Sequence, residues 1–404
     1  LLVDELRDQD GDSVNRILLP TLSDTRKTVG LEKINPFEPG NSEIFTTSAS
    51  SKSSYTYEKL VDLLARSIYM PKDVIVLGID WRVPVKEGLI GEDFVMGMKT
   101  DPTFKEADFA REYLSIYTSE SEESWFNFDK MNKHRRIINA EWSAKLRKDL
   151  DFFYLFSVDT GRFHDQSVVF IFKVLNSNGT LKARIVNIIV LGRTAESRVF
   201  STQAADLKEL IRAFDPIEVV IDTNGLGVGL ADQMIQTQVS MDGTVLPPFG
   251  FFNDDEYKKI QPKEASQILY SFKATQALNR EMHSNAFTRI NSGNVDFLIK
   301  EQEARRKLMA TQRGQKMSLT ERTKILMPYE MTSKLFEEMG NLRLKRTGSA
   351  MDIVLEQINS RFPKDKFSAL EMGLYRIKVR EEELSKRQRR YSNRKRSLVF
   401  YSGR

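Results

Sequence analysis

The chain has 404 residues, with 61 Lys and Arg against 56 Asp and Glu, and it contains no cysteine. This length allows two domains with separate cores, and the lack of cysteine excludes a disulfide scaffold and thiolate metal sites and fits a reducing cytoplasm. No apolar run approaches the roughly 20 residues that a membrane-spanning helix needs, so we expect no membrane association.

An apolar run at the start of the chain, Leu1–Val3, ends in Asp4 and Glu5. In a Walker B strand, an Asp at this position holds the Mg²⁺ of ATP and the following Glu orients the attacking water. The sequence contains no G-x-x-x-x-G-K-[ST] loop, so we expect the phosphate-binding part of such a site to precede residue 1. Because buried strands often end in acids, a plain structural strand is the alternative interpretation.

A second strand is predicted over Glu43–Ala49 and carries Thr46, Thr47 and Ser48 near its end. Hydroxyl groups at such a position can sense the γ-phosphate of a nucleotide and pass its state to a neighbouring element. The competing interpretation is a Ser/Thr-rich loop that runs to Ser54.

Two further elements are predicted in the N-terminal part, an amphipathic helix over 57–69 and a strand over 74–81. We place a domain boundary near residue 150, immediately before the first strand of a second domain. The expected parts are a first domain with its linker over 1–150, a second domain over 151–380 and a basic tail over 381–404.

The run Phe152–Val158 is rich in Phe, Tyr and Val, is typical of a buried strand and is followed by Asp159. A hairpin is expected next, with its second strand over Val168–Val174 and Asp165 in its turn. A carboxylate at the end of a buried strand is costly to desolvate unless a cation or hydrogen bonds compensate it. Asp159 is therefore a candidate metal ligand, and Asp165 is either a second one or simply the residue that begins the next strand.

The next predicted elements are a strand over 183–191, a helix over 202–214 and a strand over 218–221 that ends at Asp222. Three sequential strands, a helix and a further strand resemble the ribonuclease H order, in which the acids of the first and fourth strands lie side by side. This resemblance predicts that Asp159 and Asp222 are neighbours in an α/β fold whose mixed sheet is flanked by helices.

Glycines follow Asp222 in the segment Asn224–Gly229, with a G-x-G-x-G spacing that falls short of the dinucleotide-binding fingerprint. A tight turn that opens a helix over 229–238 explains them. A long helix is predicted over 265–287. The charged stretch 300–324 is either an exposed helix and loop or one wall of a DNA path.

A third acid, Asp365, lies between Lys364 and Lys366. Together with Asp159 and Asp222 it makes a set of hard oxygen ligands that suits Mg²⁺ or Mn²⁺. Two such ions about 3.5–4 Å apart can activate water and stabilise the leaving oxygen of a phosphodiester, while the lysines neutralise the polyanion. At each acid the alternative interpretation is an ordinary turn or cap residue.

Basic charge gathers at the end of the chain. From Gly373 to Arg404 there are eleven Lys and Arg against three Glu, a net charge of +8, whereas the whole chain carries +5. Such a tail binds phosphate without reading sequence, and its affinity falls steeply as salt rises. A solvated terminus or a contact with another protein component is equally compatible with this composition.

These segments resemble the large terminase subunit of tailed bacteriophages, the motor that packages and cuts viral DNA. The resemblance runs through nearly the whole chain, except that the Walker A and adenine-binding segments of the family would precede residue 1. The matching segments are Leu2–Glu5 for the Walker B motif, Thr46–Ala49 for the coupling motif, and Val158–Asp159 with Asp165, Ile221–Gly227 and Lys364–Leu370 for the nuclease pattern.

The resemblance implies the C-terminal part of a P-loop ATPase domain followed by a ribonuclease H-like nuclease domain. In such a protein, the implied metal ligands of the nuclease are Asp159, Asp222, Asp365 and Asp165. The implied nucleotide site takes Asp4, Glu5, Thr46, Thr47 and Ser48, with Glu5 as the residue that activates water for ATP hydrolysis.

The implied activity is metal-dependent cutting of concatemeric double-stranded DNA, coupled in a complete protein to ATP-driven translocation into the procapsid. The expected cofactors are Mg²⁺ or Mn²⁺ in the nuclease and ATP with Mg²⁺ in the motor. The expected partners are double-stranded DNA, the portal protein, the small terminase subunit and further copies of the chain in a ring. The expected location is the host bacterial cytoplasm, with transient docking on the procapsid.

Two other functions fit parts of the sequence. A recombination or junction nuclease on a ribonuclease H-like scaffold would also use the three acids, but the Walker B and hydroxyl-rich segments argue against it because such nucleases need no motor. A non-catalytic DNA-binding assembly protein would use the basic tail and leave the acids without a role. Metal-dependent cleavage separates this last function from both enzymes.

Overall fold

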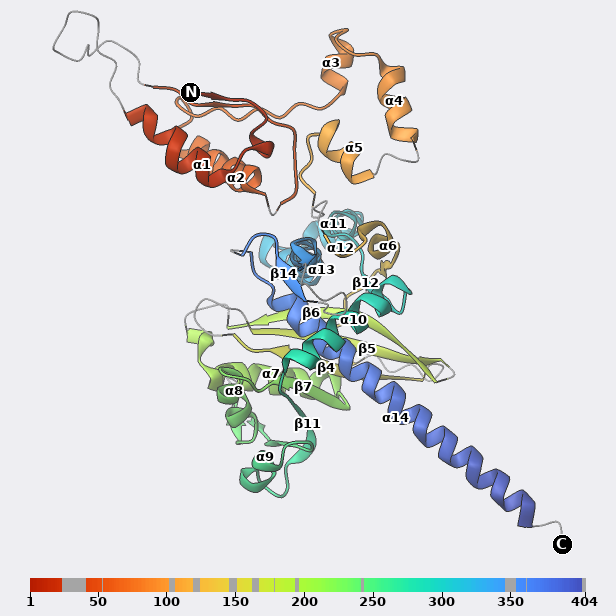
Figure 1. The fold of residues 1–404 in the computed structure, drawn as a ribbon. Helices are drawn as coiled ribbons and strands as arrows, with labels where there is room; N and C mark the ends of the chain where they lie inside the picture. Colours follow the sequence, from red (N-terminus) through yellow and green to blue (C-terminus); the bar gives the residue numbers. More distant parts are fainter. Residues whose placement is uncertain are drawn as a thin grey trace, which may run out of the picture. The chain divides into compact units, whose positions relative to one another are not determined.

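The computed structural model describes residues 1–23, 41–52, 54–101, 106–118, 124–144, 151–161, 167–177, 179–192, 196–240, 243–345, 354–360 and 362–401, with side chains to residue 386. The chain divides into two compact units, Leu1–Ser124 and Trp125–Arg404 (Figure 1). The assignment of 1–150 to a motor domain with its linker stays a prediction. No helix in the described part of the chain is both long and apolar enough to cross a membrane.

The first unit contains a two-stranded parallel sheet, in which Leu2 pairs with Ile44 and Val3 pairs with Phe45. A small core of Val3, Leu6 and Val14 lies beside it. The elements are β1 (Leu2–Val3), η1 (Leu6–Asp8), α1 (Gly11–Ser13), η2 (Val14–Leu18), η3 (Leu19–Ser23), β2 (Ile44–Phe45), α2 (Tyr55–Tyr69), α3 (Arg82–Lys86), α4 (Glu92–Thr100) and α5 (Glu106–Glu112).

One element predicted in this unit is wrong. Residues 74–80 form no strand, and Ile75 and Leu77 are 77% and 86% exposed. Strand preference describes side chains that fit a half-buried sheet, so an apolar run becomes a strand only where another strand takes up its backbone hydrogen bonds. No described segment of the chain pairs with these residues.

The second unit is built on an eight-stranded mixed sheet of order β10-β11-β7-β4-β5-β6-β12-β3. β4, β5 and β6 pair antiparallel, β7 pairs parallel with β4, and β11 pairs parallel with β7. β8 pairs with β9, and β13 pairs with β14, in two separate two-stranded sheets. The strands of the whole unit are β3 (Arg135–Ile137), β4 (Phe152–Asp159), β5 (Ser167–Ser177), β6 (Thr180–Leu191), β7 (Glu218–Asp222), β8 (Gln238–Val239), β9 (Val245–Leu246), β10 (Phe249–Phe251), β11 (Ser266–Phe272), β12 (Val295–Leu298), β13 (Leu342–Leu344) and β14 (Leu355–Gln357).

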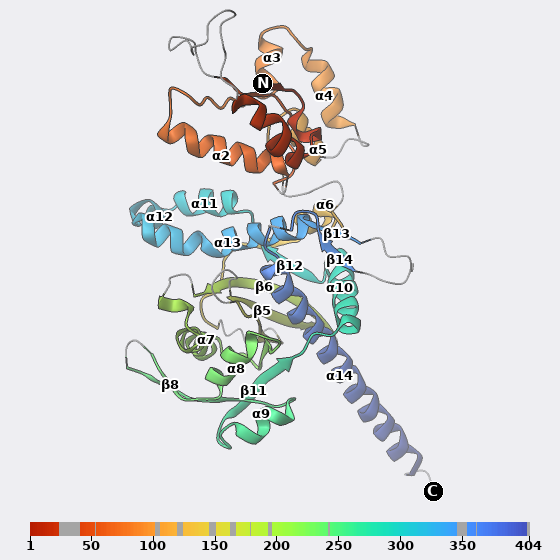
Figure 2. The ribbon, with the colours of Figure 1, turned by 60° about the vertical axis from the view of Figure 1, so that its left-hand side comes forward.

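Helices cover both faces of this sheet (Figure 2). Successive residues of β4 enter different cores, because Leu155 packs with α10 and α14 on one face and Phe156 packs with α7 and α8 on the other. The helices of this unit are α6 (Phe128–Lys133), η4 (Glu196–Arg198), α7 (Phe200–Phe214), α8 (Gly227–Met234), α9 (Asp255–Ile260), α10 (Gln276–Asn291), α11 (Glu301–Met309), α12 (Gln312–Lys316), α13 (Leu319–Gly340) and α14 (Asp365–Tyr401).

The predicted fold class is confirmed for this unit, since three antiparallel strands, a helix and a fourth strand beside the first make a mixed sheet with helices on both faces. The helix predicted over 265–287 is wrong, because its first part is β11 and only its second part belongs to α10. β11 lies beside β7, with Leu269 opposite Val219 and Phe272 opposite Asp222. A short apolar run does not distinguish a strand from a buried helix by its period, and here the neighbouring strand decides.

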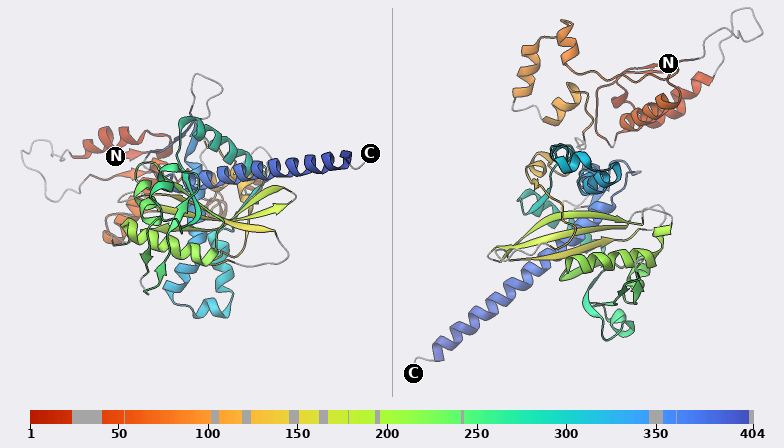
Figure 3. Two further views of the ribbon diagram at one scale, coloured as in Figure 1. Left: turned by 90° about the horizontal axis from the view of Figure 1, so that it is seen from below. Right: turned by 180° about the vertical axis from the view of Figure 1, so that it is seen from behind.

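The long helix α14 lies against β4, β5 and β6. Its close approach depends on Gly373, where a Cβ atom would come within 2.3 Å of the Phe172 ring on β5. The helix continues through the predicted basic tail to Tyr401, and Figure 3 shows this end extending beyond the sheet. Side chains from residue 387 lie outside the described ones, so the binding role of the tail stays a prediction.

A buried ion network fastens α14 to the start of β7. Glu218 is fully buried, its Oε2 accepts hydrogen bonds from Arg376 Nη2 at 3.2 Å and from Arg380 Nε at 2.7 Å, and its Oε1 accepts from Arg376 Nε. A buried carboxylate without partners would be strongly destabilising, so the two arginines and Glu218 depend on one another.

We predict that Glu218→Ala lowers the free energy of unfolding by about 3–5 kcal/mol, because two guanidinium groups lose their buried counterion. Urea unfolding followed by circular dichroism measures this change. Glu281→Ala is the matched control, since it removes the partly exposed partner of Lys378 on the same helix and costs less than about 1 kcal/mol. Equal losses in the two variants would contradict the role given to burial.

Candidate metal centre

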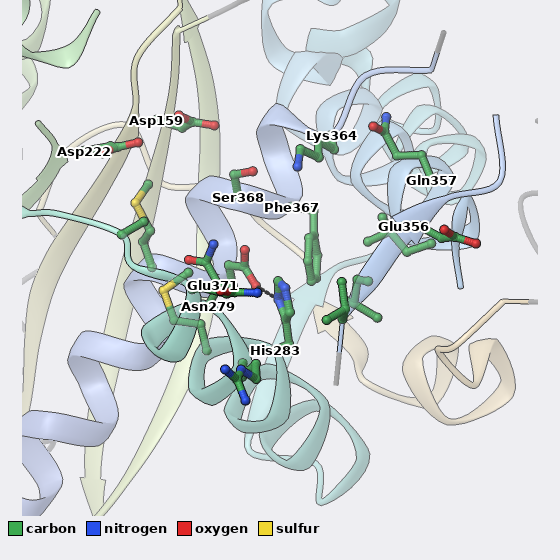
Figure 4. Close-up of a pocket in the computed structure, with 18 of the residues that line it drawn as sticks. Asp159, Asp222, Asn279, His283, Glu356, Gln357, Lys364, Phe367, Ser368 and Glu371 are labelled. Atoms are coloured by element: carbon green, nitrogen blue, oxygen red, sulfur yellow. Dashed lines mark hydrogen bonds and ion pairs between the residues drawn. The ribbon is translucent and has the colours of Figure 1, made fainter. Parts of the chain in front are cut away.

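Two of the three predicted acids lie side by side at the carboxyl ends of neighbouring parallel strands. β4 and β7 pair with Val158 opposite Ile221, so the next residue on each strand is an acid, Asp159 on β4 and Asp222 on β7. Both line one cavity of about 470 Å³ (Figure 4). The prediction that these two residues are neighbours is therefore confirmed in position.

The third predicted acid, Asp365, comes from a helix, because it is the first residue of α14. Burial raises the pKa of Asp159 to about 8, and the charges of Asp365 and Asp222 add to this rise, so both of these acids lie close enough to act on Asp159. Burial also raises the pKa of Asp222, although Asn224 N–H donates to its Oδ1 at 3.0 Å.

Crowded, desolvated carboxylates of this kind fit a divalent cation, since oxygen ligands suit Mg²⁺ and Mn²⁺ and a cation relieves the repulsion. Over the described ranges, no three acidic or histidine side chains already form a complete metal-ligand group. The joint binding of ions by Asp159, Asp222 and Asp365 stays a prediction. Asp165, the fourth predicted ligand, lies outside the described residues.

The two lysines beside Asp365 have different surroundings. Lys364 lines the cavity. Burial raises the pKa of Asp159 and of Glu371, and the positive charge of Lys364 offsets part of each rise. Lys366 is only 3% exposed, and its Nζ donates to Glu338 Oε1 on α13 at 2.8 Å. The phosphate-neutralising role of Lys364 therefore stays a prediction, whereas the same prediction for Lys366 is wrong because the helical start of α14 turns it into the protein.

The cavity also contains a pair that sequence reasoning missed. His283 Nδ1 on α10 and Glu371 Oε2 on α14 lie 2.6 Å apart, and the His283 ring stacks on Phe367. Burial raises the pKa of Glu371, while His283 lowers it. Figure 4 shows the pair further along the cavity than Asp159 and Asp222. No local pattern could have found this pair, because its two residues lie on different helices, 88 positions apart in the chain.

A glycine sets the distance between Asp222 and the helix that follows it. A Cβ atom at Gly227 would lie 1.7 Å from the Asp222 carbonyl oxygen, closer than any side chain can approach. Gly225 in the same turn has a positive φ of 53°, which glycine adopts without strain. The turn that opens α8 therefore explains these glycines, as predicted, without a nucleotide.

The predicted nucleotide residues gather at the ends of β1 and β2 in the first unit. Thr46 Oγ1 donates a hydrogen bond to Asp4 Oδ1, and Arg7 N–H donates to Thr47 Oγ1 at 3.1 Å. Glu5 adopts a left-handed backbone with φ of 48°, and Ser48 accepts a hydrogen bond from Thr47 through its carbonyl oxygen. These residues are thus brought together, and their role toward ATP stays a prediction.

No family model and no curated protein sequence matches the chain. Its structure is similar to the magnesium-bound large terminase nuclease of the thermophilic phage G20c, at 16% identity and a TM-score of 0.36, over 63% of this chain and 98% of that one. It is also similar to the HK97 bacteriophage large terminase, at 11% identity and a TM-score of 0.33, over 92% of this chain and 69% of that one.

A third similar structure is the manganese-soaked terminase nuclease domain of human cytomegalovirus. Its identity is 14% and its TM-score is 0.33, over 61% of this chain and 93% of that one. The structural neighbours are thus large terminases and their nuclease domains.

The raised pKa of Asp159 predicts how stability without metal changes with pH. An unfolded Asp has a pKa near 3.9, so between about pH 4 and 8 the unfolded chain has released a proton that the folded chain still holds. The free energy of unfolding therefore falls as pH rises through this window, by about 1.4 kcal/mol per pH unit at the steepest. Urea midpoints in EDTA at pH 5 and pH 8 measure the fall.

In the variant Asp159→Asn this fall should be reduced, because the buried group no longer ionises. The matched control is Asp215→Asn, which changes an exposed Asp at the end of α7 where Asn also adopts the left-handed backbone. A fall of the same size in Asp159→Asn and in the unmodified chain would contradict the prediction.

Proposed function

We propose that this chain is the large subunit of a viral DNA-packaging terminase and that its second unit is a metal-dependent endonuclease that cuts concatemeric double-stranded DNA. The observation that supports this most is the meeting of Asp159 and Asp222 at adjacent strand ends, with the charge of Asp365 acting on Asp159. Three half-buried carboxylates close together are costly without a cation, and cutting a phosphodiester is the chemistry that such a set performs with metal ions.

In this proposal Asp159, Asp222 and Asp365 hold Mg²⁺ or Mn²⁺. When bound, the ions supply an activated water and stabilise the leaving oxygen, so no protein nucleophile is needed. Lys364, on the wall of the same cavity, neutralises the phosphate of the strand being cut.

The first unit would contribute to an ATP-driven motor. Asp4 would hold the Mg²⁺ of ATP, Glu5 would orient the attacking water, and Thr46, Thr47 and Ser48 would couple the nucleotide state to movement. The hydrogen bond between Thr46 and Asp4 supports this coupling, because it links the two strand ends directly. Hydrolysis of ATP then requires a phosphate-binding loop that this sequence lacks.

The proposed setting follows from the same function. Several copies in a ring would translocate double-stranded DNA through the portal protein, with the small terminase subunit as a further partner. The chain would work in the host bacterial cytoplasm, docked for a time on the procapsid.

Plasmid cleavage tests the nuclease. The chain with Mn²⁺ or Mg²⁺ should cut supercoiled DNA, EDTA should abolish cutting, and Asp222→Ala should lower the rate by at least about 100-fold because a ligand to the ions is lost. Circular dichroism confirms that the variant is folded. Asp255→Ala is the control, since it removes an exposed carboxylate from α9 of the same unit and should cut normally.

If a folded Asp222→Ala variant cut DNA at the normal rate, Asp222 could not be a ligand to the catalytic ions, and the proposed site would be wrong. Metal-independent DNA binding with no cutting under any condition would instead favour the non-catalytic assembly protein.

Truncation after Lys386 tests the basic tail. It removes seven Lys and Arg and no acid, so affinity for duplex DNA should fall and the slope of log affinity against log salt should become shallower by several units. Fluorescence anisotropy of a labelled duplex over a salt series measures both quantities. An unchanged slope would rule out DNA binding by the tail and leave a solvated terminus or a contact with another protein.

A further inference from the structure

Glu338 lies in the last turns of α13, is 1% exposed, and touches the start of α14 directly behind Asp365. Its Oε1 accepts a hydrogen bond from Lys366 Nζ at 2.8 Å, and its Oε2 accepts one from Phe367 N–H at 3.0 Å. We propose that Glu338 is a positioning residue for the metal centre, which holds the first turn of α14 so that Asp365 faces Asp159 and Asp222. This inference rests on the proposed nuclease function.

The first reason is where the two hydrogen bonds fall. The first N–H groups of a helix have no partner within the helix, and they are usually capped by a residue of the same chain segment just before it. Here a side chain from another helix takes the N–H of Phe367, and it takes the side chain of Lys366 as well. Lys366 and Phe367 directly follow Asp365, so the two hydrogen bonds fix the backbone of the helix at the position of the acid.

The second reason is that α13 holds the approach to Asp365 too. Asn341, directly after α13, is fully buried, and its side chain donates to Asn359 O at 2.9 Å and accepts from Asn359 N–H at 2.8 Å. Its carbonyl oxygen also accepts from Ile358 N–H at 2.7 Å. Leu335 and Met339 anchor α13 in the core below the sheet strands, so both sides of Asp365 are tied to one rigid helix.

The third reason is energetic. Replacing a buried ion pair by apolar residues of similar size is often neutral or stabilising, so stability alone does not account for Glu338 and Lys366. Burial raises the pKa of Glu338, and the charge of Asp365 adds to this rise, so the ionised carboxylate of Glu338 is costly to keep at this position. A fixed geometry at the metal centre is a benefit that an apolar pair would not provide.

The test measures Mn²⁺ binding without DNA, from the loss of the free-ion signal in electron paramagnetic resonance. Two double variants remove the charges of both Glu338 and Lys366. They differ only in whether residue 338 keeps an oxygen that accepts the hydrogen bond from Phe367 N–H. Glu338→Met with Lys366→Met leaves Phe367 N–H without an oxygen partner, whereas Glu338→Gln with Lys366→Met keeps one in nearly the same shape. We expect about 10- to 100-fold weaker binding in the first and binding within about threefold of the unmodified chain in the second.

Two further variants separate positioning from general loosening. Glu218→Gln with Arg376→Met removes an equally buried ion pair that joins the start of β7 to the middle of α14, and it should leave Mn²⁺ affinity unchanged. Glu338→Asp keeps the charge but shortens the side chain by one methylene, so it should bind Mn²⁺ more weakly while remaining folded. Near-ultraviolet circular dichroism and the melting temperature establish folding for each variant.

Normal affinity in a folded Glu338→Met, Lys366→Met variant would overturn the inference and leave the nuclease intact. If that variant does not fold, normal affinity in Glu338→Asp overturns it in the same way. An equal loss in the Glu218 and Arg376 variant would show that any loosening of α14 matters, which also overturns a specific role for Glu338. Absence of Mn²⁺ binding by the unmodified chain would instead overturn the metal centre itself.

Discussion

The parallel pairing of β4 with β7 is the constraint on which the candidate site depends. Because the two strands run the same way and both end at an acid, their hydrogen-bond register alone brings Asp159 beside Asp222. Helices on both faces bury these strand ends, and burial is the first cause of the raised pKa of each acid. The same pairing thus creates both the proximity of the carboxylates and the electrostatic cost that a cation would relieve.

α14 joins this sheet to the rest of the site. Near its middle, Arg376 and Arg380 bind Glu218 at the start of β7, and at its first turn Glu338 holds the backbone that follows Asp365. One helix is therefore fastened at two levels, to the strand that carries Asp222 and to α13. Glu218 holds the middle of α14 against the sheet, whereas Glu338 holds the turn that follows Asp365, so the position of Asp365 depends on the packed contact with α13.

The sequence was sufficient for the strands that carry the first two acids, because β4 and β7 are apolar runs and their order resembles a known arrangement. It was insufficient where tertiary contacts decide. The apolar residues of the run that became β11, from Ala265 to Phe272, follow a helical period, and the strand state comes instead from pairing with β7. Lys366 was expected at a phosphate because it flanks Asp365, but the helical backbone there turns it toward Glu338, far away in sequence. The pair of His283 and Glu371 likewise joins two helices whose contact no local pattern shows.

The close approach at Gly227 bears on how this protein can vary. The space between the end of β7 and the first turn of α8 admits a hydrogen atom but no methyl group, since a Cβ atom would overlap the carbonyl oxygen of Asp222. Any other amino acid at this position would have to displace the helix or the peptide group that carries the acid. A library of all amino acids at residue 227, sorted for activity, would thus return glycine. Substitution of Gly227 would disturb the site through the backbone of Asp222, without removing any of the acids.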